Sequence, residues 1–116
     1  MNTKFSYLYR DASNYKQSQS VVVEGELSKE QIEQIYEACD GEYFIPAQVG
    51  LPEIRFDEIT EDDHCWFEIG DIELTEEEPT ELNTAEEVFK SFMETKEKGW
   101  DDVSYAPSIA DNERDY

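Results

Sequence analysis

The sequence predicts a single small α+β domain, in which an antiparallel sheet carries two helices on one face. Segments that alternate between polar and apolar residues, as strands do, occur near residues 4–10 and 65–74. Two other segments begin with the polar spacing of a helix N-terminus. The predicted order is two strands, a helix, a loop, one or two strands and a second helix. Because 116 residues suit one core, we assign residues 1–102 to one domain.

An aromatic strand is predicted first. Residues 4–10 place three aromatic side chains on one face: Phe5, Tyr7 and Tyr9. Residues 11–14 (DASN) include three short polar residues that favour a turn, and residues 21–23 are three valines, which favour a strand. A β-hairpin is therefore expected at the N-terminus.

The two helices are predicted from capping boxes, in which a Ser or Thr is followed three residues later by Glu or Gln. Ser28 and Gln31 have this spacing, as do Thr84 and Glu87. An apolar stripe follows each box, formed by Ile32, Ile35, Tyr36 and Cys39 in the first helix and by Val88, Phe89, Phe92 and Met93 in the second. The first helix is expected to end near Cys39 and the second at Gly99.

The middle of the chain is expected to contain a packed loop and a long strand. Residues 42–52 hold two prolines and a glycine among apolar residues, which suits an irregular segment or an edge strand, and we predict a packed loop. Residues 65–74 form the strand, but their apolar phase changes at Gly70. A β-bulge at Gly70 explains this change.

One contiguous core is predicted from these periodicities. Its members are Phe5, Tyr7, Val21, Val23, Ile32, Ile35, Phe67, Ile69, Val88, Phe89 and Phe92. Residues 103–116 mix proline, serine and charges without a period, so we expect a partly disordered C-terminal tail.

The charge of the chain restricts its partners. Thirty Asp and Glu residues against nine Lys and Arg residues give a net charge of −21, which opposes direct binding to nucleic acid or to an anionic membrane. Fourteen carboxylates and no cation lie between Arg55 and Lys90. No apolar run long enough to span a membrane and no signal-peptide pattern is present, so we expect a cytoplasmic protein with Cys39 and Cys65 as buried free thiols.

Three stretches of the chain together resemble a group of small acidic bacterial proteins. They are residues 7–16 (YLYRDASNYK), 42–52 (EYFIPAQVGLP) and 62–68 (DDHCWFE). The resemblance extends to about Thr80. It implies no activity and no site residue.

The strongest candidate for metal or acid–base chemistry is the cluster Asp62, Asp63, His64 and Cys65. A structural zinc site needs four Cys or His ligands, whereas the whole chain has one His and two Cys. The acidic residues from Asp57 to Asp63 lack the Gly and Glu of an EF-hand loop. Glycines occur singly, without a phosphate-binding loop. We therefore predict no metal, no cofactor and no enzymatic activity.

The acidic stretch leads to the functional hypothesis of a binding protein that imitates nucleic acid and inhibits a basic bacterial defence or DNA-processing protein. The predicted contacts are Asp62, Asp63, Glu68, Asp71, Glu73, Glu76, Glu77 and Glu78. The alternative is an adaptor or small subunit that binds through Trp100, Tyr105 and Ile109, while the acidity only keeps the domain soluble. Salt separates the two hypotheses, because only a charge-driven complex weakens steeply as salt rises. The sequence does not indicate an oligomeric state.

Overall fold

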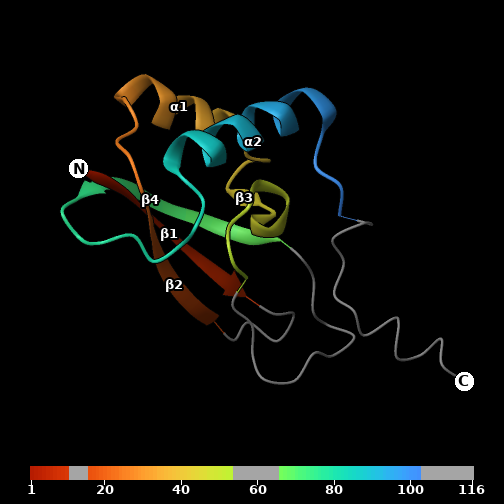
Figure 1. Ribbon diagram of the computed structural model, residues 1–116. Coiled ribbons are helices and arrows are strands. Elements are labelled where there is room, and N and C mark those ends of the chain that lie inside the picture. The colour runs from red at the N-terminus through yellow and green to blue at the C-terminus, as the bar shows by residue number, and fades with distance from the viewer. Residues whose placement is uncertain (11–15, 54–65, 103–116) are drawn as a thin grey trace, which may run out of the picture.

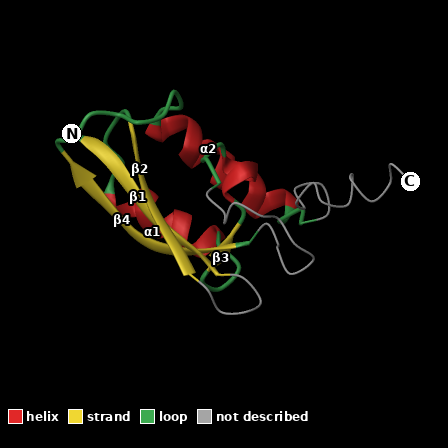
Figure 2. Cartoon of the chain, turned by 90° about the horizontal axis from the view of Figure 1, so that it is seen from below, coloured by secondary structure: helices red, strands yellow, loops and turns green. Residues whose placement is uncertain are grey.

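The structure, a computed structural model, describes residues 1–10, 16–53 and 66–102 (Figure 1). Its elements are β1 (Asn2–Arg10), β2 (Lys16–Val23), α1 (Lys29–Ala38), β3 (Tyr43–Phe44), the 3-10 helix η1 (Pro46–Val49), β4 (Phe67–Thr75) and α2 (Ala85–Lys98). The strands form one antiparallel sheet in the order β2-β1-β4-β3. Both helices lie on the same side of this sheet (Figures 1 and 2). The predicted α+β fold is confirmed.

No helix in the described ranges is both long enough and apolar enough to cross a membrane. The predicted tail, residues 103–116, lies outside the described residues.

Both predicted capping boxes are present. The backbone N–H of Gln31 donates to Ser28 Oγ over 3.1 Å, and the Ser28 N–H donates to Gln31 Oε1 over 2.9 Å. Thr84 and Glu87 exchange the same two bonds at the start of α2, over 3.2 and 3.0 Å. These bonds satisfy N–H groups that have no partner inside a helix, which explains why each helix begins where the sequence predicts.

The predicted core is confirmed as one cluster between the sheet and the helices. Eight of its eleven predicted members are buried, and the other three, Ile32, Ile69 and Phe89, are partly buried against it. The cluster also includes residues that the prediction omitted, among them Tyr9, Leu27, Phe44, Val49, Leu51 and Ile72. Several of these come from the segment that was expected to be a loop.

Residues 42–52 are more regular than the predicted packed loop. Phe44 pairs with Phe67 of β4, so β3 is a short edge strand, and Pro46 begins η1. Proline suits the first position of such a turn because its missing N–H would have no partner there. Gly50 then takes φ +80°, a left-handed conformation that favours glycine, and ends η1.

The predicted bulge lies in β4, which has one more residue than β1 between two neighbouring pairs of the register. The pairs on its two sides are Phe5 with Ile72 and Tyr7 with Ile69. Gly70 is needed here because a Cβ atom at this position would lie 2.8 Å from the backbone oxygen of Ser6. The bulge keeps both Ile69 and Ile72 on the core side of the strand, although they are three residues apart.

The outer edge of β4 is closed at the bulge by a side chain. The hydroxyl group of Tyr36, on α1, donates to the Gly70 carbonyl over 2.8 Å and accepts from the Ile72 N–H over 3.1 Å. β3 pairs with β4 only at Tyr43 and Phe44, so the hydroxyl replaces part of a neighbouring strand. Burial raises the pKa of this hydroxyl group.

Candidate functional site

One face of the sheet carries neither of the two helices, and we call it the outer face (Figure 2). Its members follow from the strand register, because residues paired across strands point to the same side. Phe5, Tyr7 and Tyr9 are buried toward the helices, so the residues between them lie on the outer face. The outer-face pairs of β1 are Lys4 with Glu73, Leu8 with Glu68, and Ser6 with Ser20.

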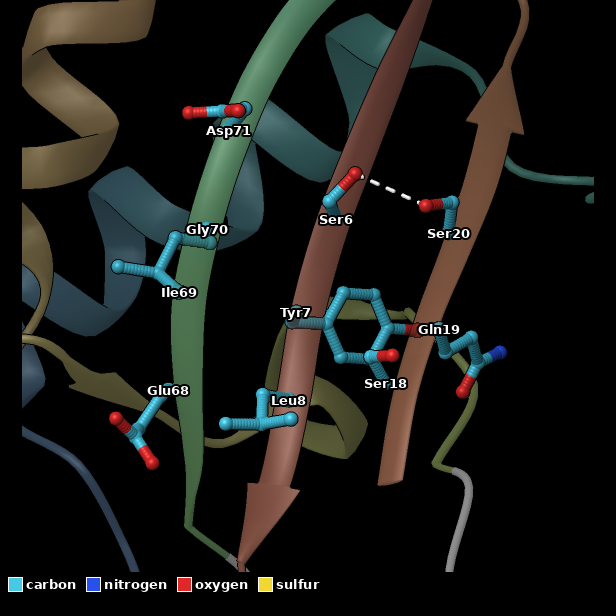
Figure 3. Close-up of a pocket in the computed structure, with 10 residues that line it drawn as sticks. All are labelled: Ser6, Tyr7, Leu8, Ser18, Gln19, Ser20, Glu68, Ile69, Gly70 and Asp71. Carbon is cyan, nitrogen blue, oxygen red and sulfur yellow. Dashed lines mark hydrogen bonds between the residues drawn. The ribbon is translucent and has the colours of Figure 1, made fainter. Parts of the chain in front are cut away.

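Three predicted contact residues form an acidic row on this face. Glu68 and Glu73 share the outer face because the bulge adds one residue between them, and Asp71 lies in the bulge itself. Asp71 and Glu73 are exposed, and Glu68 is half-buried. Figure 3 shows Glu68 and Asp71 extending from the side of β4 that faces away from β1. Without the bulge, Glu68 and Glu73 would point to opposite faces.

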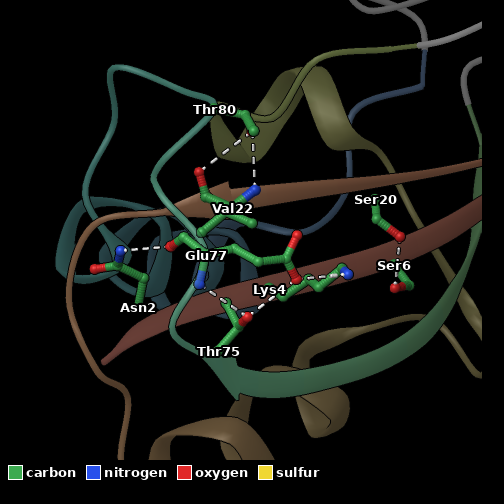
Figure 4. Close-up of polar contacts among 8 residues, drawn as sticks. All are labelled: Asn2, Lys4, Ser6, Ser20, Val22, Thr75, Glu77 and Thr80. Atoms are coloured by element: carbon green, nitrogen blue, oxygen red, sulfur yellow. Dashed lines mark hydrogen bonds and ion pairs between the residues drawn. The ribbon is translucent and has the colours of Figure 1, made fainter.

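The turn after β4 folds back over one end of the outer face (Figure 4). Glu76, Glu77 and Glu78 lie in this turn and are exposed. The backbone oxygen of Glu77 accepts a bond from Asn2 Nδ2 over 2.9 Å. Farther along, the N–H of Thr80 donates to the carbonyl of Val22 over 2.8 Å. The turn is therefore attached to both β1 and β2, which holds its carboxylates close to the sheet.

The acidic stretch contains no Lys or Arg, but the fold brings a cation from β1 to Glu77. The ammonium group of Lys4, on β1, lies 2.9 Å from Glu77 Oε2. This hydrogen bond lowers the pKa of the Glu77 carboxyl and raises that of Lys4. The pair is exposed and contributes little to stability. Lys4 is 73 residues from Glu77 in the sequence, so only the fold shows that the two charges meet.

A shallow groove of about 560 Å³ crosses the outer face beside the acidic row. Its residues come from β4, β1 and β2, as Figure 3 shows. Small side chains form the bottom of the groove, among them Ser6 and Ser20. The hydroxyl groups of these two serines form a hydrogen bond of 2.9 Å. Leu8 and Ser18 continue the groove toward Glu68. The groove was not predicted from the sequence, although the alternation along residues 4–10 places Ser6 and Leu8 opposite the aromatic side chains.

The structure describes only part of the other predicted sites. Asp62 and Asp63, with the neighbouring His64 and Cys65, lie outside the described residues. Within the described ranges, no group of three His, Cys, Asp or Glu side chains is placed to hold a metal ion.

The apolar surface of the adaptor hypothesis is also incomplete. Tyr105 and Ile109 lie outside the described residues. Trp100 is not the exposed residue that this hypothesis needs, because it is partly buried against the core and its ring lies 6.1 Å from that of Phe92.

The Cys39 thiol is buried at the end of α1 and donates to the Ile35 carbonyl over 3.4 Å. Burial raises its pKa from 9.0 to about 12 because a thiolate is poorly solvated there. In a Cys65→Ser variant, we expect a disulfide reagent at pH 8 to label the folded protein about 1000-fold more slowly than the unfolded chain. Equal rates would contradict the burial of the thiol.

The same shift affects stability at high pH. A raised pKa in the folded state means that the unfolded chain loses its thiol proton first, so the contribution of Cys39 to stability is complete below about pH 9 and is lost as pH rises toward 12. Cys39→Ala should therefore flatten the decline in stability over this range, as measured by urea unfolding.

Comparison of the chain with protein-family models, with curated proteins and with solved structures finds no match.

Proposed function

We propose that this protein is a non-enzymatic binding protein whose acidic outer face binds a basic surface, with nucleic-acid-binding proteins as the partner class. The observation that carries this proposal is the bulge at Gly70, which brings Glu68, Asp71 and Glu73 to one face that the helices leave uncovered. An ordered row of carboxylates attracts Lys and Arg side chains and repels phosphate. The adjoining groove provides a concave surface for a partner element.

The spacing of the row bears on how closely it imitates nucleic acid. At about 3.3 Å per residue, the three carboxylates span roughly 15 Å, or one charge in about 7 Å. Duplex DNA carries about one charge per 1.7 Å of its axis. The row alone is thus sparser than a duplex, and the turn carboxylates Glu76 and Glu78 extend it at one end. These charges support recognition of a localised basic patch rather than replacement of a long duplex.

The adaptor hypothesis has weaker support from the described residues. Their exposed large apolar side chains are Met1, Tyr36, Tyr43, Leu74 and Leu82. They come from different elements, and Tyr36 uses its hydroxyl group to bind the backbone of β4. Scattered apolar residues of this kind are normal on a soluble domain and do not define an interface.

The test uses a triple variant, Glu68→Gln, Asp71→Asn and Glu73→Gln, which removes the row while keeping side-chain size. Partners are captured with the parent protein from a bacterial lysate, identified by mass spectrometry and purified. We expect the triple variant to bind the partner at least about 10-fold more weakly at low salt, with a smaller difference at high salt. Added DNA should compete with the parent protein for the partner.

The matched control is Glu30→Gln, Glu33→Gln and Glu97→Gln, which makes the same change in net charge at exposed positions on α1 and α2. These positions lie on the other side of the sheet, so this variant should bind like the parent protein. If the two triple variants lose the same affinity, net charge and not the row determines binding. If the outer-face variant loses none, the acidity serves only solubility.

A further inference from the structure

A second shallow hollow, of about 540 Å³, lies at the β3 end of the sheet, and the described residues that line it are Asp40, Tyr43, Trp66 and Asp102. We propose that this aromatic and acidic pocket binds the guanidinium group of an arginine side chain. This assignment rests on the proposed function, because the pocket would hold one arginine side chain of the basic partner. None of the four residues belongs to the acidic row.

Two walls of the pocket are held rigidly by a tight turn. Asp40 and Tyr43 exchange two backbone hydrogen bonds, over 2.8 and 3.0 Å. Gly41, inside this turn, takes φ +65°, which suits glycine. Tyr43 then enters β3 and pairs with Glu68 of β4. The tyrosine ring is 47% exposed, so it is positioned by its backbone yet accessible to a ligand.

The other two walls are held by Gln48 and by ring packing. The side-chain amide of Gln48 donates to the Gly99 carbonyl over 3.1 Å and accepts from the Asp101 N–H over 2.9 Å, which fixes the segment that leads to Asp102. Trp66 packs against Trp100 with the ring centres 6.0 Å apart.

Trp100 is fixed in turn, because its indole N–H donates to the Ala38 carbonyl over 2.9 Å. The backbone at Asp40 and Tyr43 and the ring of Trp66 are therefore held in place before a ligand arrives, which lowers the entropic cost of binding.

The chemistry of the lining selects a planar organic cation. Aromatic faces attract cations, and carboxylates at the rim pair with them, whereas both repel an anion. A guanidinium group suits the site better than an ammonium group because it can stack on an aromatic ring while donating two parallel bonds to a carboxylate. Among the described lining residues, Tyr43 and Trp66 offer aromatic rings, which favour an organic cation over a metal ion.

The pocket also adjoins the acidic row. Tyr43 and Glu68 are cross-strand partners, so their Cβ atoms are about 5 Å apart on the outer face. A partner that places one arginine in the pocket would bring its neighbouring basic residues over Glu68 and the row. Tyr43 therefore links the pocket to the acidic row.

The experiment titrates the full chain with the capped tripeptide acetyl-Gly-Arg-Gly-amide, followed by tryptophan fluorescence and by the indole N–H signals in NMR. Lysine and citrulline versions of the peptide are the ligand controls. We expect saturable binding of the arginine peptide, binding of the lysine peptide at least about 3-fold weaker, and no saturation with the neutral citrulline peptide. The Trp66 indole signal should shift and that of Trp100 should shift less.

Variants of the pocket test the assignment. Tyr43→Ala should weaken arginine-peptide binding at least about 10-fold, and Tyr43→Phe should retain it, because the ring is kept. Asp40→Asn should also weaken binding, whereas Glu30→Gln, an equal charge change on α1, should not. Circular dichroism checks that each variant is folded, which the exposed position of Tyr43 favours.

The outcomes separate this proposal from the proposed function. Equal binding of the arginine and citrulline peptides, or unchanged binding by Tyr43→Ala, would overturn the arginine site. The outer-face triple variant should still bind the tripeptide within about 2-fold, because its changes lie outside the pocket lining. If the protein binds the arginine peptide but the outer-face triple variant keeps full affinity for the partner, the arginine site stands and the acidic row is rejected.

Discussion

Replacing Phe92 by alanine is expected to lower the free energy of unfolding by about 3–5 kcal/mol. Phe92 is fully buried on the inner side of α2, and its ring packs against Phe44 and Trp100 at centre distances of 5.8 and 6.1 Å. The substitution leaves a cavity where the helix meets β3. Urea unfolding followed by circular dichroism measures the loss.

The control for this prediction is Leu82→Ala. Leu82 is fully exposed in the turn before α2, so its removal should change the free energy of unfolding by less than about 0.5 kcal/mol. Because the Trp100 ring packs against Phe92, the Phe92 variant should also shift the tryptophan emission of the folded protein. A loss below about 1 kcal/mol for Phe92→Ala would mean that α2 does not pack on the sheet as described.

Gly70→Ala is expected to lower the free energy of unfolding by about 1–3 kcal/mol, which is unusual for an exposed position. The added Cβ atom would lie 2.8 Å from the Ser6 carbonyl oxygen, and backbone atoms cannot rotate away as a flexible side chain does. Relief requires β1 and β4 to separate at the bulge. The hydrogen bonds of the Tyr36 hydroxyl group to Gly70 and Ile72 should weaken as a result.

Asp71→Ala is the matched control, since it changes the adjacent bulge residue without adding an atom near β1. It should cost less than about 0.5 kcal/mol. Amide hydrogen exchange provides a second measurement, because Gly70→Ala should speed exchange at Ile72, whose N–H donates to Tyr36. A Gly70→Ala variant as stable as the parent protein would show that the strands do not approach closely at the bulge, and the alignment of the acidic row would then lose its physical basis.

The helices could be predicted closely because local chemistry sets their ends. A capping box needs only residues three positions apart, and the Ser28 and Thr84 boxes both lie where the spacing predicts. The bulge was predictable for a similar reason, since the change of apolar phase around Gly70 is visible along one strand. The short strand β3 was missed because two residues are too few to show a period, and the partner Phe67 is distant in sequence.

The acidic row was predicted on the condition that Gly70 forms a bulge, which lets the polar residues after it share the solvent side with Glu68. The sequence shows that Glu68, Asp71 and Glu73 lie on one strand, and it leaves open which side of the sheet they face. Their common face depends on the pairing of β4 with β1, which the sequence pattern alone does not establish. The arginine pocket was not predicted at all, because its four residues come from segments as far apart as Asp40 and Asp102.

Local sequence patterns were enough to predict the two helices and their ends, the long strands, the bulge and the large excess of negative charge, but not β3 or η1. Packing of the sheet and helices sets which distant side chains meet. It brought Lys4 to Glu77, the Tyr36 hydroxyl group to the edge of β4, and Tyr43 beside Glu68. Propensity, capping and periodicity act over a few residues, whereas the sites depend on contacts between distant segments that form only when the sheet and its helices pack.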